Sequence, residues 1–101
     1  MILTKEYLSR FLTDFLKKDK GLYIDNLDIE KINEDAFDDF TFLKRLDISD
    51  NQIEKIEGLD KLINLKFLKI SYNPISKIEG LDNLVSLENL VIEKKIGRAH
   101  V

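Results

Sequence analysis

The sequence predicts an α/β solenoid, in which short convex returns join the strands of a curved parallel sheet and an N-terminal helix caps the first turn. Residues 43–64 and 65–86 align without a gap, so the chain repeats itself with a period of 22 residues. Each copy begins with a short strand pattern, and an amphipathic segment precedes the copies. One such repeat cannot bury its own apolar face, and neighbouring repeats must therefore stack.

The N-terminal segment, residues 1–20, is predicted to form one amphipathic capping helix. Thr4 is a candidate N-cap and Gly21 a candidate stop. The apolar stripe is of ordinary width and the polar face carries both signs of charge, which favours a helix docked on its own domain over a membrane-surface or partner-binding helix. The apolar residues with helical spacing are Tyr7, Leu8, Phe11, Leu12, Phe15 and Leu16.

Each clear repeat begins with the pattern LxxLxL, which predicts a short strand. Leu46 and Ile48 point into the core and Asp47 points away, because side chains alternate along a strand. Asn51 and Asn73 follow the strands, where an amide side chain can satisfy backbone groups that a turn leaves unpaired. Stacked repeats would place these amides in a ladder along the solenoid.

The repeat domain is predicted to extend over residues 21–94. Residues 21–42 form a degenerate first repeat, with two extra residues and Leu27 where asparagine is expected. Residues 87–94 begin a partial repeat, in which Leu87, Leu90 and Ile92 occupy the strand positions.

The full pattern, LxxLxLxxNxIxxIxGLxxL, is similar to that of the leucine-rich repeat family. The segments IEKIEGL at 53–59 and ISKIEGL at 75–81 resemble the 22-residue class found in the leucine-rich regulatory subunit of protein phosphatase 1. The resemblance implies a leucine-rich repeat solenoid that acts as an intracellular scaffold or regulatory subunit and binds a protein, with a phosphatase-like partner among the candidates. The matching residues are the buried ones, so no contact residues are carried over.

Two alternatives to a free-standing scaffold remain open. The repeats are also compatible with the targeting arm of a larger enzyme, whose catalytic domain would lie beyond this sequence. They are compatible as well with a bacterial internalin-like surface protein, which would need a secretion signal that is not found at the start of this sequence.

The composition argues against catalysis and metal binding, and against nucleic acid or an anionic membrane as a partner. The net charge is −3, so no basic field attracts nucleic acid or an anionic membrane. There is no cysteine, and the acidic segment at Asp47 and Asp50 lacks the glycine and distal glutamate of a calcium loop. We therefore expect a non-enzymatic protein without metal or cofactor, in the cytoplasm or nucleus.

The outward-facing strand residues form the predicted protein-binding surface on the concave sheet. Exposed aromatic side chains and arginine are the residue types that dominate interface energetics. Phe67 and Tyr72 have the alternative role of covering their neighbours, and Asp47 and Lys69 would form a solvated ion pair. The predicted binding residues are Tyr23, Arg45, Asp47, Phe67, Lys69 and Tyr72. The predicted rows are Gly21, Arg45, Phe67 and Asn89; Tyr23, Asp47, Lys69 and Val91; and Asp25, Ser49, Ser71 and Glu93.

The last residues are predicted to be foreign to the protein. IGRAHV at 96–101 resembles the translation of a sequencing-library adapter, ATC GGA AGA GCA CAC GTC, whose next triplet is a stop. Lys95 stands where the repeat calls for asparagine, and its codon would be a hybrid of native and adapter bases. We expect residues 95–101 to be a non-native tail, which removes His100 as a candidate site, and the chain to be C-terminally truncated.

Truncation would leave the segment 87–94 as an unpaired sheet edge over an open apolar core. Such edges and patches promote association. We therefore expect the isolated chain to be marginally stable or to self-associate.

Overall fold

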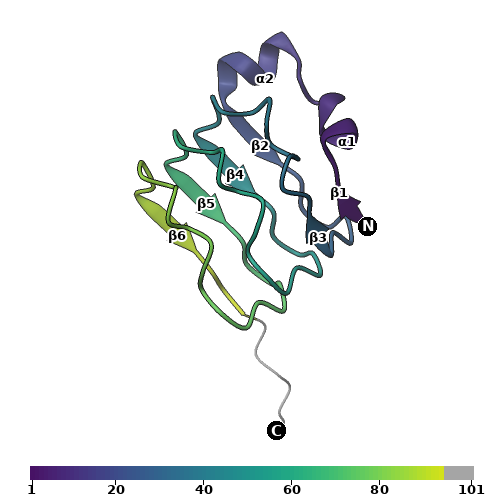
Figure 1. Ribbon diagram of the computed structural model, residues 1–101, viewed down its shortest axis with the longest axis vertical. Coiled ribbons are helices and arrows are strands. Elements are labelled where there is room, and N and C mark those ends of the chain that lie inside the picture. The colour runs from purple at the N-terminus through teal and green to yellow at the C-terminus, as the bar shows by residue number, and fades with distance from the viewer. Residues whose placement is uncertain (95–101) are drawn as a thin grey trace, which may run out of the picture.

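A four-stranded parallel sheet forms the centre of the molecule in a computed structural model that describes residues 1–94 (Figure 1). Its strands are β2 (Gly21–Tyr23), β4 (Arg45–Asp47), β5 (Phe67–Lys69) and β6 (Asn89–Val91), and they lie side by side in chain order. Parallel neighbours require the chain to return to the starting end between strands, and the returns here contain little regular structure.

The predicted tail, with Lys95 and His100, lies outside the described residues.

The register of the sheet confirms the first two predicted rows. Arg45 pairs with Phe67 and Phe67 with Asn89, which is the 22-residue period of the sequence. Gly21 pairs with Arg45, so the degenerate repeat accommodates its two extra residues without shifting the strand register. Tyr23, Asp47, Lys69 and Val91 are paired in the same way.

The N-terminal segment forms two short helices, α1 (Lys5–Ser9) and α2 (Asp14–Asp19), so the prediction of one helix over 1–20 is wrong. Thr4 caps the first helix as predicted, since its hydroxyl accepts the Tyr7 amide at 3.1 Å. Thr13 caps the second by accepting the Leu16 amide at 3.1 Å, and such a side-chain bond starts a new helix at this point. In residues 1–94, no helix is long and apolar enough to cross a membrane.

The end of the second helix also differs from the prediction. It ends at Asp19 and is capped by Lys20, which has a left-handed backbone with a φ of 64°, whereas Gly21 belongs to β2. Among the residues of the predicted apolar face, Leu8 and Leu16 are buried, but Phe15 is 76% exposed. The break between the helices explains this, because residues on either side of it no longer share one face.

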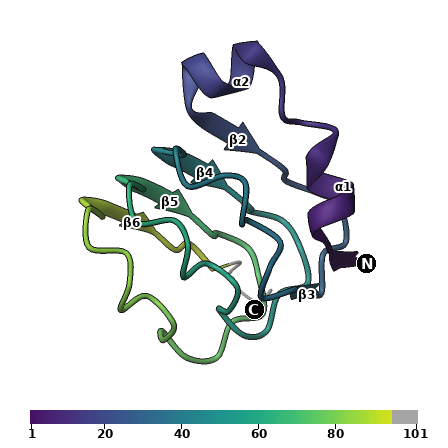
Figure 2. The ribbon, with the colours of Figure 1, turned by 45° about the horizontal axis from the view of Figure 1, so that its top comes forward.

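A second, two-stranded sheet was not predicted. β1 (Ile2–Leu3) pairs in parallel with β3 (Lys31–Ile32), which ties the start of the chain to the first return. Leu3 is fully buried in the common core. Figure 2 shows both helices on the β2 side of the sheet, opposite β6.

The third predicted row, Asp25, Ser49, Ser71 and Glu93, is only partly exposed, because Asp25 and Glu93 face solvent but the two serines do not. Ser49 and Ser71 are buried, with 3% and 0% exposure. The Ser49 hydroxyl accepts the Ser71 amide at 3.1 Å, and the Ser71 hydroxyl accepts the Glu93 amide at 3.0 Å. The strands have ended by this point, so the alternation of sides on which the prediction relied no longer holds.

The predicted asparagine ladder is present. The Asn51 Oδ1 atom accepts the amides of Leu27 and Ile29 at 2.9 and 3.0 Å. Its Nδ2 group donates to carbonyls of its own turn and of the preceding turn, those of Ile48, Ser49 and Ile24. Asn73 repeats the arrangement one turn later, accepting from Ile53 and donating to Ile48, Ile70 and Ser71.

The repeat glycine is needed for close contact between successive turns. Gly58 has a φ of +76°, and a Cβ atom there would lie 2.6 Å from Ile32 Cγ2 and 2.8 Å from the Asn33 carbonyl oxygen. A side chain at Gly58 would therefore cause backbone strain and would also clash with the preceding return at Ile32 and Asn33. Gly80 has a φ of +74° at the equivalent place.

We expect Asn51→Ala to lower the free energy of unfolding by about 2–4 kcal/mol, because buried amides and carbonyls on two turns lose their partner. Urea denaturation followed by circular dichroism measures this loss. Asn64→Ala is the control, since that exposed amide makes a single bond to the Thr41 carbonyl at 2.8 Å and its loss costs about 1 kcal/mol or less. Equal effects of the two substitutions would contradict the ladder's structural role.

We expect Gly58→Ala to cost about 2–4 kcal/mol, from the positive φ and the contacts at Ile32 and Asn33. Gly21→Ala is the matched control: its Cβ would meet only flexible side-chain ends of Tyr23 and Arg45, at 3.0–3.1 Å. Thermal unfolding of both variants distinguishes them, and a smaller effect at Gly58 than at Gly21 would refute the close-approach explanation.

Candidate functional site

The outward face of the four-stranded sheet carries the predicted binding residues. We call this face the sheet surface and define it by Tyr23, Arg45, Asp47, Phe67 and Lys69, with Tyr72 at its border. Leu46 and Leu68 are fully buried, so their strand neighbours project to the other side. Tyr23 is 57% exposed and the other members are half-buried.

Arg45 is held in place by groups at the start of the sheet. Its Nε atom lies 3.4 Å from the Tyr23 hydroxyl, and its Nη2 atom lies 3.4 Å from the Asp19 carboxylate. The same nitrogen donates to the Asp19 carbonyl. The hydrogen bond with the Tyr23 hydroxyl, and to a lesser extent the charge of Asp19, raises the pKa of Arg45 above its ordinary value.

Gly21 lies next to the Arg45 guanidinium and the Tyr23 hydroxyl. It is buried, although its row was predicted to face outward. The contacts that a Cβ atom would make there are with the Tyr23 hydroxyl and the Arg45 guanidinium. The absence of a side chain at Gly21 therefore provides the space in which Arg45 and Tyr23 meet.

Asp47 and Lys69 are neighbours by register, but the predicted ion pair between them is not formed. The Asp47 Oδ1 atom instead accepts the amide of Ser49 at 2.9 Å. Asp47 thus stabilises the end of its own strand. Within residues 1–94, neither side chain takes part in an ion pair, which leaves an acid and an ammonium group on the sheet surface.

Phe67 and Tyr72 occupy different parts of this region. Phe67 lies in β5 between Arg45 and Asn89 and is half-buried, so part of its ring contacts solvent. Tyr72 has a left-handed backbone, with a φ of 57°, in the turn after the strand. It lines a pocket of about 360 Å³ together with Asn51, Gln52, Asn73, Pro74, Ile75 and Lys94.

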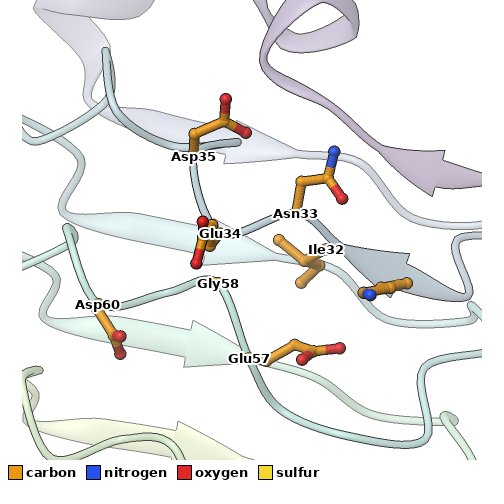
Figure 3. A pocket seen from close by; sticks show the side chains of 8 residues that line it. Ile32, Asn33, Glu34, Asp35, Glu57, Gly58 and Asp60 are labelled. Atoms are coloured by element: carbon orange, nitrogen blue, oxygen red, sulfur yellow. The ribbon is translucent and has the colours of Figure 1, made fainter.

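A second, larger pocket lies in the returns, away from the sheet surface. It has a volume of about 620 Å³ and is lined largely by polar side chains. Figure 3 shows the carboxylates of Asp35, Glu57 and Asp60 pointing away from one another, so they do not converge on one point. The lining residues are Lys31, Ile32, Asn33, Glu34, Asp35, Glu57, Gly58 and Asp60.

The described residues contain no cluster of three or more acidic, histidine or cysteine side chains that could hold a metal ion. The shortest ion pair among residues 1–94 joins Lys61 and Asp38 at 2.7 Å on another part of the surface. The hydrogen bond from Lys61 lowers the pKa of Asp38, and the hydrogen bond to Asp38 raises the pKa of Lys61. Each shift favours the charged form of its group, as expected for a surface ion pair.

Sequence reasoning found which residues share the sheet surface but missed two that shape it. Asp19 belongs to α2 and lies outside the repeats, so the 22-residue period could not connect it to Arg45. The burial of Gly21 also had no sequence signal of its own. Both follow from the folding of the N-terminal segment against the first strand.

Comparison with known families gives a match to a model described as leucine rich repeat, over residues 20–75, which is more than half of the chain. The matched region contains β2, β4 and β5 and both asparagines of the ladder. No curated protein matches the chain.

We expect Arg45→Gln to lower the free energy of unfolding by about 1 kcal/mol or less, because its ion pair with Asp19 is partly solvated. The ring resonances of Tyr23 in NMR spectra should shift nonetheless, since the ring loses its partner. Lys66→Gln is the control, because it removes a positive charge from an exposed position beside β5. An unfolding free energy lower by 3 kcal/mol or more would contradict the surface role of Arg45.

Proposed function

Because the chain belongs to the leucine-rich repeat family, we propose that it is a non-catalytic module that binds a protein partner on its sheet surface. Members of this family generally mediate protein–protein interactions and are typically not enzymes. The proposal assigns the contact to Tyr23, Arg45, Asp47, Phe67, Lys69 and Tyr72.

The observation that carries the proposal is the pairing of aromatic and charged side chains in register on a rigid sheet. Tyr23 lies beside Asp47, and Arg45 lies beside Phe67. Aromatic residues and arginine contribute most to protein interfaces, and side chains fixed by a sheet lose little freedom on binding. The hydrogen bonds of Arg45 hold it in one orientation before a partner arrives.

We further propose that the repeats form a solenoid with the sheet surface on its concave side. In this arrangement the N-terminal segment caps the first turn. Its burial of Leu3, Leu8 and Leu16 supports that role, since these side chains cover the core beside β2. Repeat proteins use such capping segments to end a core that would otherwise be open.

The proposed role is that of a scaffold or regulatory subunit in the cytoplasm or nucleus. A phosphatase-like partner is the candidate suggested by the IxKIEGL segments, and neither nucleic acid nor a membrane is proposed as a partner. A net charge of −3 supports a protein partner over these, because it offers no general attraction for polyanions.

A photo-crosslinking amino acid placed at Phe67 tests the proposal in cells. We expect it to capture a defined protein, whereas the same group at Ile63, which is 49% exposed and outside the rows, should not capture it. The captured protein is then purified and its affinity for the unmodified chain measured.

Alanine substitution measures the contribution of the surface to that affinity. Tyr23→Ala and Phe67→Ala should each weaken binding by about tenfold or more, because each removes an aromatic contact. Lys55→Ala, at an exposed position in a return, should leave the affinity unchanged. Capture from Ile63 alone, or losses confined to the Lys55 variant, would place the contact elsewhere.

A further inference from the structure

A row of lysines lies at the start of the sheet, with one lysine before each of the first three strands. Lys20 precedes β2, Lys44 precedes β4 and Lys66 precedes β5. The Lys44 amide donates to the Lys20 carbonyl at 2.9 Å, and the Lys66 amide donates to the Lys44 carbonyl at 2.8 Å. We call these three residues the lysine row. The three strands lie side by side in Figure 1, so the row crosses the sheet.

The positive charges of the lysine row are not used in ion pairs within residues 1–94. Neighbouring strands lie about 4.8 Å apart, and like charges that face each other on a sheet lower its stability. Lys66 is exposed, and Lys20 and Lys44 are half-buried. A half-buried lysine packs its stem on the protein and keeps its ammonium group in water. The row therefore adds nothing to the fold through its charge, and it presents three ammonium groups at one end of the sheet.

Acidic residues near the lysine row offset its charge only in part. Glu88 is the next residue in line, since its amide donates to the Lys66 carbonyl at 2.9 Å. The Asp19 carboxylate lies 3.4 Å from Arg45 and is paired with that side chain. The first residue of each strand of the sheet and the residue before it together include four positive side chains and one negative. The start of the sheet is thus basic, although the net charge of the chain is −3.

The other end of the sheet carries the opposite charge. Asp25 lies after β2 and Asp50 after β4, and both are exposed and outside the ion pairs of residues 1–94. The chain from Lys20 to Asp25 runs through β2, and an extended chain of that length spans about 16 Å. This exceeds the Debye length of about 8 Å at physiological salt, so these carboxylates do not cancel the field of the row. An acidic segment is therefore attracted to the start of the sheet and repelled from its end.

We propose that the lysine row binds an acidic segment of the protein partner, and that this segment crosses the starts of β2, β4 and β5. The inference rests on the proposed function, because it names the chemistry of a partner bound at the same sheet. Acidic side chains three or four residues apart on a helix lie about 5–6 Å apart, close to the strand spacing, so a helix presents one carboxylate to each lysine. Complementary charges of this kind speed association and exclude partners of the wrong sign.

The test is a titration of the ¹⁵N-labelled full chain with an octaglutamate peptide, followed by NMR at low salt. We expect the amide resonances of Lys20, Lys44 and Lys66 to shift, with a dissociation constant that rises as salt is added. An octalysine peptide should leave these resonances in place. Shifts spread evenly over the chain, or equal shifts with the two peptides, would overturn the proposal.

Charge reversal shows whether the row itself makes the contact. Lys44→Glu with Lys66→Glu should raise the dissociation constant of octaglutamate by about tenfold or more, and octalysine should now shift the amides of the row. Lys31→Glu with Lys55→Glu is the matched control, because it changes the net charge equally at exposed positions in β3 and a return. It should change the constant by about threefold or less. Circular dichroism checks that both variants are folded, and equal losses in the two would overturn the proposal.

Two further measurements separate this inference from its alternatives. An oligothymidylate of eight nucleotides that binds the row more tightly than octaglutamate would make the row a nucleic-acid contact and overturn the proposal. The protein captured through Phe67 tests the proposed function by itself. If Tyr23→Ala and Phe67→Ala weaken its binding but Lys44→Glu with Lys66→Glu does not, the proposed function stands and the acidic segment is refuted. If only the lysine variant weakens its binding, the row makes the contact and the aromatic surface does not.

Discussion

The side chain of Asn51 links two turns of the chain through five hydrogen bonds to backbone groups. The turn after each strand cannot pair all its own amides and carbonyls, and a buried group without a partner is costly. One amide side chain satisfies groups above and below it, provided that the turns stay one strand spacing apart. The stacking distance and the strand register between these two turns depend on this contact, which is made even though the first repeat is two residues longer.

Other polar and small residues support the same stacking. The buried hydroxyls of Ser49 and Ser71 accept amides from the following turn, and Gly58 allows the return to approach Ile32. All these residues lie at repeat positions and all are directed inward or between turns. The residues that specify the fold are therefore almost entirely distinct from those of the sheet surface. Asp47 is the exception, because it caps the Ser49 amide and also faces outward.

The sequence was sufficient to predict the period, the parallel sheet, two of the three rows and the asparagine contacts, because each of these signals occurs more than once. Three features occur only once in the chain, so no repeated pattern in the sequence revealed them. They are the second helix cap at Thr13, the pairing of β1 with β3 and the exposure of Phe15. The row containing Ser49 was misplaced because strand alternation was extended past the end of the strand. Asp50 has a φ of 56° there, which breaks the alternation.

Surface ion pairs and buried apolar side chains contribute very different amounts to the stability of this fold. The Arg45–Asp19 pair is about two-fifths exposed on each side, and such pairs contribute about 0–1 kcal/mol. Burying one leucine contributes about 1.5–3 kcal/mol, so a row such as Leu22, Leu46 and Leu68 outweighs every ion pair on the surface. Charged residues on the sheet surface can therefore change with little effect on folding, and under the proposed function such changes would alter which partner fits. For this reason a repeat pattern made of buried residues identifies the fold more sharply than the partner.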